Sequence, residues 1–312
     1  MDAITPTYRH VQVRVPASTA NLGSGFDIFG MALEIYNTFS LRLTTESQWS
    51  VTVPTTLTMP ANRDNLVFQS ACRLFKEVGF DPQGLHLELD INIPLARGLG
   101  SSSSAIIGGL VAANAMVGFP CDRKALLDMA IEIEGHPDNV TPALIGGMTL
   151  SYKTGQTHRY LNLPCPSELN IVLAIPDFQL GTAQARSILP PHITRSDAIF
   201  NGSRTALLVA ALYEKRYDWL ATAMEDHIHQ PYRASLVPGM TEAIAAGYRA
   251  NALGVALSGA GPTLIALVQH DAKAVGAVLQ ETFRQHGVSC NIRTVQPDID
   301  GAVVVDSTFH RI

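Results

Sequence analysis

The sequence predicts an α+β fold, because segments with the two-residue period of a strand occur together with segments that have helical spacing. Residues 85–93 alternate apolar and polar side chains, as a half-buried strand does. Residues 65–78 place Leu66, Ala71, Leu74 and Val78 on one side of a helix. The mixture favours antiparallel strands with helices on one face, and the 312 residues are enough for two domains.

In the first half of the chain, Val11–Val15 predicts a strand that Pro16 ends, and small residues then predict a loop to Asp27. The next expected elements are a strand at 36–45, the helix at 65–78, the strand at 85–93 and a helix at 103–117. A further helix starts after Asp122, its N-cap, and ends at Glu134 before Gly135. A glycine pair at 146–147 leads into another strand.

Two prolines and a change in the sequence pattern at 161–168 predict a boundary between an N-terminal domain, 1–163, and a C-terminal domain, 164–312. In the second half, strands are expected at 171–175, on both sides of 258–262, and at 289–295. Helices are expected at 197–213, 217–224, 241–250 and 272–285. The two halves therefore share the mixed α+β character.

Composition excludes several classes of protein. The net charge is −5 without a basic tract, which argues against nucleic acid as a partner. Residues 1–10 lack the apolar run of a secretory signal, and the longest apolar stretch, 105–119, is too short to cross a membrane. The four cysteines are scattered without metal spacing. We therefore expect a cytoplasmic enzyme in a reducing compartment.

The stretch from Pro94 to Ala105 crowds two glycines and four serines between a strand and a helix. Glycine lets the backbone approach a ligand closely, and a helix start offers free N–H groups, so this loop favours the phosphates of a nucleotide. It lacks the lysine of a Walker loop and the third glycine of the dinucleotide fingerprint. The predicted ATP-binding residues here are Pro94, Leu95, Ala96, Arg97, Gly98, Leu99, Gly100, Ser101, Ser102, Ser103 and Ser104.

Two more glycine-rich corners, at residues 16–27 and 258–262, suggest that three distant loops meet around one ligand. With these motifs the chain resembles the GHMP kinase superfamily. Its segments 21–27, 136–142 and 182–190 resemble the homoserine kinase family most closely. The resemblance implies a two-domain GHMP kinase fold, with an N-terminal domain like ribosomal protein S5 domain 2 and a ferredoxin-like C-terminal domain. It also implies transfer of the γ-phosphate of ATP to L-homoserine, giving O-phospho-L-homoserine for threonine biosynthesis, and a homodimer.

ATP chemistry needs Mg²⁺, which commonly takes one or two protein oxygens. Ser102 and Glu134 are the candidate ligands and match the superfamily's motif serine and glutamate, while Glu132 remains the alternative carboxylate. The resemblance places the reacting hydroxyl at His136 and Asn139. An amide cannot take a proton at neutral pH, so Asp138 is the rival base, unless it caps the adjoining turn.

Amino-acid recognition needs partners for a carboxylate and an ammonium group. Thr182 and Arg186 share one face of a helical turn, and Arg186 and Arg233 match the family's carboxylate-binding arginines. The resemblance assigns Asn21 and Asp27 to the amino group and the reacting end. Residues expected at the nucleotide are Asn62 and Asn65 near the adenine, with Gly259 and Gly261 in the third corner. The histidines other than His136 are interpreted as structural or solvated.

Two alternative functions stay open. Another small-molecule kinase of the GHMP superfamily would not need two arginines for a carboxylate and would favour aspartate at the position of Asn139. A catalytically silent protein that binds ATP or a metabolite on the same scaffold would be expected to lose Ser102, Glu134 or the glycines, and all of these are present.

Overall fold

The computed structural model describes residues 5–53 and 59–308. The first sheet is mixed and has seven strands, of which the last comes from the second half of the chain: β1 (His10–Asn21), β2 (Gly25–Thr44), β3 (Trp49–Thr52), β4 (Gly84–Asp90), β5 (Met148–Thr154), β6 (Thr157–Leu163) and β11 (Val303–Thr308). Its order is β11-β1-β2-β4-β3, with β5 beside β2 and β6 beside β5. β3 runs parallel to β4, and the other neighbours are antiparallel.

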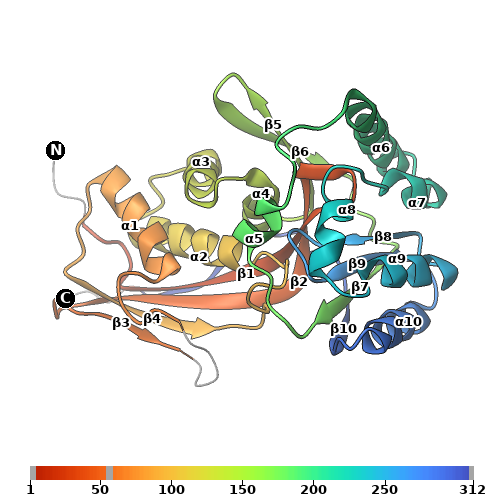
Figure 1. Ribbon diagram of the computed structural model, residues 1–312. Coiled ribbons are helices and arrows are strands. Elements are labelled where there is room, and N and C mark those ends of the chain that lie inside the picture. The colour runs from red at the N-terminus through yellow and green to blue at the C-terminus, as the bar shows by residue number, and fades with distance from the viewer. Residues whose placement is uncertain (1–4, 54–58, 309–312) are drawn as a thin grey trace.

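Four helices pack on one face of this sheet (Figure 1): α1 (Leu66–Val78), α2 (Ser101–Met116), α3 (Arg123–Glu134) and α4 (Pro137–Ile145). α2 and α4 lie directly on β1 and β2, and α1 packs on α2. α2 is buried almost all round, so its alanines and glycines permit close approach: Gly108 lies against Phe39, and Gly109 lies against α1. The start of α2 is thereby fixed between the sheet and the other helices.

The second sheet consists of β7 (Asn170–Pro176), β8 (Gly254–Leu257), β9 (Leu264–Val268) and β10 (Cys290–Val295), in the antiparallel order β10-β7-β9-β8. The chain between β7 and β8 forms α5 (Thr182–Ser187), α6 (Arg195–Tyr213), α7 (Leu220–Ala223), α8 (Gln230–Arg233) and α9 (Met240–Arg249), with single turns at Tyr217–Trp219 and Ala234–Leu236. α10 (Ala272–Gln285) connects β9 to β10. Strands and helices in this order form a ferredoxin-like unit, which confirms that expectation.

One face of the second sheet packs on α9 and α10, and its other face meets the first half of the molecule. Ile171, Leu173 and Ile265 share a buried cluster with Phe29 and Met31 of β2. The α+β prediction is therefore confirmed, and the two halves are joined by a continuous apolar core.

The predicted end of the first strand at Pro16 was wrong. β1 continues to Asn21, and β2 already begins at Gly25, so the loop has only three residues. The register of β1 against β2 shifts between Pro16 and Ala17, and such a bulge accommodates a proline. The small side chains that follow are buried, so they mark a tightly packed strand.

The strand expected at 85–93 ends at Asp90. Its ladder stops because the backbone N–H groups of Asn92 and Ile93 both donate to Oδ1 of Asn37, at 2.9 Å each. The helix expected from Ser103 begins at Ser101. Helix α3 with Asp122 as its N-cap is confirmed, since the carboxylate accepts the N–H of Ala125 at 2.8 Å.

The predicted boundary at 163/164 falls between β6 and β7, where the chain passes from the first sheet to the second. Residues 303–308, however, pair with β1 as strand β11, so the division placed them on the wrong side. This pairing joins residues nearly 300 positions apart, which local sequence does not reveal. The exact boundary at 163/164 and the likeness of the first domain to ribosomal protein S5 domain 2 stay predictions. No helix within residues 5–53 and 59–308 has the length and apolar composition of a membrane span.

Candidate active site

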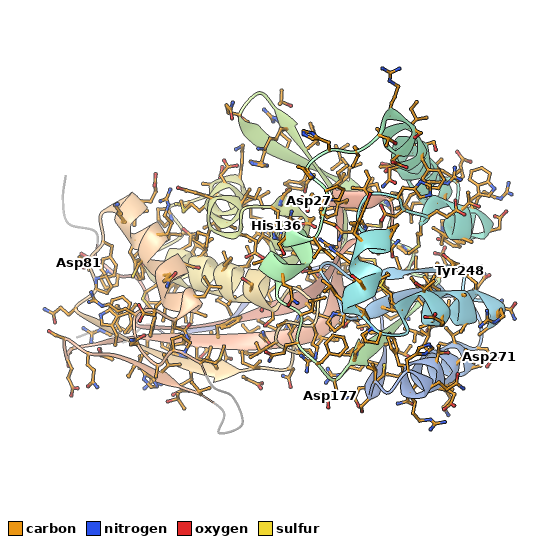
Figure 2. All side chains as sticks on the ribbon, viewed as in Figure 1. Asp27, Asp81, His136, Asp177, Tyr248 and Asp271 are labelled. Carbon is orange, nitrogen blue, oxygen red and sulfur yellow. The ribbon has the colours of Figure 1, made fainter. Side chains whose placement is uncertain are left out.

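A cavity of about 410 Å³ lies where the two halves of the molecule meet. Figure 2 labels Asp27 and His136 near this junction, and both residues line the cavity. The predicted residues that line it are Asn21, Asp27, Asn65, Leu95, Ala96, Arg97, Gly98, Gly100, Ser101, Ser102, Ser103, Glu134, His136, Asp138, Asn139, Thr182, Arg186, Arg233 and Gly259. Segments far apart in sequence thus line the same cavity.

Five predicted nucleotide residues do not line the cavity: Pro94, Leu99, Ser104, Asn62 and Gly261. The side chain of Leu99 is buried in the core beneath the loop. Ser104 donates to the carbonyl of Ser101 at 2.9 Å and so closes the first turn of α2. Asn62 is exposed, and its amide is bonded within a local turn to Asp64.

The loop before α2 needs glycine at two positions. Gly98 and Gly100 have φ values of 74° and 68°, a conformation that L-residues rarely adopt. A side chain on Gly98 would collide with the carbonyl of Ser258, and one on Gly100 with the hydroxyl of Ser18. The loop is therefore pressed against both of the other corners, with the free N–H groups of α2 at its end.

Hydrogen bonds hold the three corners together, which confirms that they meet. The hydroxyl of Ser258 donates to the carbonyl of Gly98 at 2.6 Å and lies 2.8 Å from Oγ1 of Thr19. The amide of Asn21 donates to the carbonyl of Gly259 at 2.9 Å. Its Oδ1 accepts the N–H of Asp27 at 3.1 Å, so Asn21 is held in place at both ends of its amide.

Glu134, and not Glu132, faces the serine-rich loop. Its two carboxylate oxygens accept hydrogen bonds from Ser102 at 3.0 Å and from Ser103 at 2.9 Å. Glu132 lies on the surface, where Arg73 binds it at 3.0 Å. The carboxylate and hydroxyl oxygens of Glu134 and Ser102 are hard donors that fit Mg²⁺. Within the described residues no three His, Cys, Asp or Glu side chains form a metal cluster.

The start of α4 brings His136, Asp138 and Asn139 to the cavity. Asp138 is buried and accepts from Nδ1 of His136 at 2.8 Å. Burial by itself would lower the pKa of His136, but the hydrogen bond to Asp138 and the charges of Asp138 and Glu134 outweigh it and raise the pKa. The N-cap residue of α4 is His136, and it makes no side-chain capping bond. The carboxylate of Asp138 therefore orients His136 and does not cap the turn.

The amide of Asn139 is oriented by Ser18. The buried hydroxyl of Ser18 donates to Oδ1 of Asn139 at 2.9 Å. The Nδ2 group of Asn139 is then left to donate to an acceptor in the cavity. This arrangement suits an amide that binds a reacting oxygen without removing its proton.

Asp27 and Arg186 bind each other. The guanidinium of Arg186 donates from Nη1 at 3.0 Å and from Nη2 at 2.6 Å to the two carboxylate oxygens of Asp27. Both side chains are about one third exposed, and the hydrogen bond to Asp27 raises the pKa of Arg186. The two groups expected to meet opposite ends of an amino acid thus neutralise each other in this structure.

Arg233, unlike Arg186, has no carboxylate partner among the described residues. It is 2% exposed, and among the described residues no carboxylate lies within 4.0 Å of its guanidinium. Burial, together with the positive charge of Arg186, lowers its pKa to about 10. A buried cation beside a cavity and without a carboxylate partner favours a bound anion.

The other end of the cavity is apolar. Its lining there is made by Phe39, Met59, Leu66, Val67, Leu89, Ile91 and Leu95. Asn65 lies beside them, but its amide already donates to Pro60 and accepts from Val67 as the N-cap of α1. A flat aromatic base fits such a surface, while the bonds to Pro60 and Val67 hold the amide of Asn65 as part of the wall.

Besides the apolar lining, the prediction missed three residues that hold the polar groups of the site in place: Ser18, Phe26 and His229. Ser18 and Phe26 lie within the glycine-rich corner at 16–27, so their positions were marked but their roles were not. Phe26 lines the cavity beneath both arginines, with its ring centre 5.5 Å from the guanidinium carbon of Arg186 and 5.3 Å from that of Arg233. His229 was grouped with the other histidines as structural or solvated, and it is buried behind Arg233.

Comparisons with known proteins agree with this geometry. The family models for the GHMP kinases N terminal domain and the GHMP kinases C terminal match residues 65–147 and 208–285. The homoserine kinase of Carboxydothermus hydrogenoformans is 46% identical over 94% of this chain and 96% of that protein. That of Desulfitobacterium hafniense is 43% identical over 95% and 100%. The crystal structure of homoserine kinase from Cytophaga hutchinsonii has a TM-score of 0.87 at 30% identity, covering 95% of this chain and 98% of that one. The chain therefore belongs to the GHMP kinase family, and the two curated relatives named above, which it matches over most of its length, are homoserine kinases.

Proposed function

We propose that this ATP-dependent kinase transfers the γ-phosphate of ATP to the hydroxyl of L-homoserine and releases O-phospho-L-homoserine, a step of threonine biosynthesis. The observation that carries the proposal is the composition of one cavity. A glycine- and serine-rich helix start with Glu134 lines one part, and Asp27, Arg186 and Arg233 line another. The names of the relatives support the same substrate pair.

The nucleotide end is assigned to the loop 95–103 and the apolar wall. The N–H groups at the start of α2 and the glycine backbone suit the triphosphate, and the apolar wall suits the base. We further propose that Mg²⁺ binds Glu134 and Ser102 together with the phosphates; when bound, it neutralises charge on the transferring group. Asn65, Gly259 and the residues buried under the loop shape this end without binding the reacting atoms.

The acceptor end suits a small zwitterion. Arg233, which has no carboxylate partner among the described residues, and Arg186 are assigned to the substrate carboxylate. Asp27 and Asn21 are assigned to its ammonium group, with Thr182 on the wall beside Arg186. Binding then exchanges partners, because the substrate carboxylate takes the place of Asp27 on Arg186 while Asp27 turns to the ammonium. Asp27 and Arg186 are each paired before and after the exchange, which limits its cost in free energy.

In the reaction, the hydroxyl oxygen forms a bond to the γ-phosphorus as the bond from that phosphorus to the β,γ-bridging oxygen breaks. Asn139 holds the hydroxyl by its amide and takes no proton. The hydroxyl proton passes to the transferred phosphoryl group or to water, since a loose transition state depends mainly on alignment and electrostatics. Asp138 remains the rival base, acting through its hydrogen bond to His136.

A substrate panel tests the proposal. ATP consumption by the full chain is measured with homoserine, serine, mevalonate, galactose and shikimate at equal concentrations. Homoserine should be preferred by at least about tenfold, because mevalonate, galactose and shikimate lack the ammonium group for Asp27 and serine is one carbon shorter. A preference for mevalonate or galactose would indicate another small-molecule kinase, and no turnover with any of them would indicate a silent binding protein.

We also propose a homodimer and a cytoplasmic location, which the family resemblance and the scattered cysteines support. Light scattering at micromolar concentration measures the mass directly, and a monomer would contradict the first of these. Fractionation of the source cells tests the second. Neither proposal affects the assignment of residues in the cavity.

A further inference from the structure

Most of the N–H groups of the Arg233 guanidinium have a hydrogen-bond acceptor within the protein. Nε donates to the carbonyl of Ala185 at 3.0 Å, and Nη1 donates to the carbonyl of Gly259 at 2.9 Å. The second hydrogen of Nη1 has Nδ1 of His229 as its partner, at 3.4 Å. Nη2 has no hydrogen-bond partner among the described residues. Three acceptors, of which one is a histidine, therefore determine the direction of the two remaining N–H groups.

The tautomer of His229 follows from its second bond. Nε2 lies 2.8 Å from the carbonyl oxygen of Gly23, which only accepts, so Nε2 carries the hydrogen. In a neutral ring Nδ1 is then an acceptor, as the guanidinium of Arg233 requires. Burial, assisted by the charge of Arg233, lowers the pKa of His229 against the opposing charge of Asp226, whose Oδ2 lies 3.5 Å from Nε2, and so favours this neutral form.

The backbone at His229 is held by a buried carboxylate. Asp226 accepts the N–H of His229 at 2.9 Å and the N–H of Gln230 at 2.7 Å. The side chain of Asp226 is also bound by the amide of Asn201 at 2.8 Å. The imidazole therefore projects from a fixed turn at the start of α8, with Arg233 four residues later.

The ring of His229 also supports the floor under both arginines. It stacks on Phe26 with ring centres 5.1 Å apart. Phe26 in turn lies beneath the guanidinium groups of Arg186 and Arg233. Through Phe26 and Gly23, His229 links α8 to the β1–β2 corner that carries Asn21 and Asp27.

We propose that His229 is a positioning residue for substrate recognition: its neutral imidazole, anchored on Gly23, accepts from Arg233 and directs Nη2 of that arginine at the carboxylate of the amino-acid substrate. The inference rests on the proposed function of this site and adds to it a residue that does not touch the substrate. It differs from a purely structural role, in which the bond to Gly23 would be the only one that matters.

Two amide variants separate these roles. In His229→Asn the short side chain brings its amide near the position of Nδ1, where Oδ1 accepts from Arg233. In His229→Gln the longer side chain brings its amide near Nε2, where it keeps the bond to Gly23 and loses the one to Arg233. We expect KM for homoserine to rise about tenfold in His229→Gln, as loss of one hydrogen bond to a charged group predicts, and to rise clearly less in His229→Asn. KM for ATP should change in neither.

The reverse order, with His229→Asn impaired and His229→Gln normal, would overturn the proposal in favour of a structural role, and so would equal increases in both. His227→Asn is the matched control: this neighbouring side chain is about half exposed, stacks on Phe200 and lies outside the cavity. A wild-type chain inactive with homoserine would instead refute the proposed function, whatever the variants do.

A spectroscopic measurement covers the case in which a His229 variant does not fold. The ¹⁵N resonances of histidine are recorded for the wild-type chain and for Arg233→Met. Loss of the donor should shift Nδ1 of His229 toward the position of a free, unprotonated ring nitrogen, while Nε2 stays unchanged. An Nδ1 resonance that does not move would overturn the proposal.

Discussion

Replacing Arg233 by methionine removes the buried cation that has no carboxylate partner among the described residues. Methionine keeps most of the apolar volume and makes none of the polar contacts. The carbonyl of Gly259 still accepts from Asn21, whereas the carbonyl of Ala185 and Nδ1 of His229 lose their arginine donor. We therefore expect the free energy of unfolding to fall by about 1–3 kcal/mol, because relief of a buried charge offsets only part of these two losses.

The effect on the amino acid should be much larger. Removing one partner of a buried charge pair costs about 2–5 kcal/mol in binding. Arg186 remains to hold part of the carboxylate, so we expect the lower part of this range, about 2–3 kcal/mol. That is about a 30- to 150-fold weaker dissociation constant for homoserine. The dissociation constant for ATP should stay within about twofold, because Arg233 lies at the amino-acid end of the cavity.

Isothermal titration of each ligand separately measures both constants. Arg204→Met is the matched control, since Arg204 pairs with Glu225 outside the cavity and should leave both constants unchanged. If Arg233→Met weakened the binding of ATP and of homoserine equally, or the binding of neither, the assignment of Arg233 to the substrate carboxylate would be refuted.

Three further predictions concern the loop, the metal and the histidine. Glu134→Gln should raise the Mg²⁺ concentration for half-maximal turnover about tenfold or more, whereas Glu132→Gln should not. The same half-maximal Mg²⁺ concentration in both variants would contradict this prediction. Gly100→Ala should lose about 1–3 kcal/mol of stability and bind ATP more weakly, because the φ of residue 100 is 68° and Ser18 blocks the new methyl group. The control variant Gly202→Ala, in open space on α6, should unfold at an unchanged or higher temperature. The pKa of His136 is raised, so its contribution to the free energy of unfolding is complete below its ordinary pKa of 6.5 and is lost as pH rises through the raised value. Denaturant titrations at several pH values measure this dependence of stability on pH. Asp138→Asn should flatten it, and an unchanged dependence would exclude the His136–Asp138 pair as its source.

The features that the sequence predicts well are those with a local physical cause. Gly98 and Gly100 mark a backbone conformation that few other residues adopt, so the loop before α2 is visible in the sequence. Strict alternation predicts the strand at β4, and the cap at Asp122 predicts the start of α3. Each of these signals acts within a few residues.

What the sequence does not show is set by contacts between distant segments. Asp27 and Arg186 are 159 residues apart, and nothing near either predicts that they pair. The choice between Glu132 and Glu134 depends on the exact rotation of α3 against α2, which packing fixes. His229 looks like an ordinary polar residue until the fold places Gly23 and Arg233 on its two ring nitrogens.

The central claim is that one cavity holds a triphosphate on the loop 95–103 and a small zwitterion between Asp27 and the two arginines. A crystal structure with a non-hydrolysable ATP analogue, Mg²⁺ and L-homoserine tests it directly. The account predicts the homoserine carboxylate on Arg233 and Arg186, its ammonium on Asp27, and its hydroxyl in line with the γ-phosphate beside Asn139. A triphosphate bound away from the serines, or an intact Asp27–Arg186 pair with homoserine elsewhere, would contradict it.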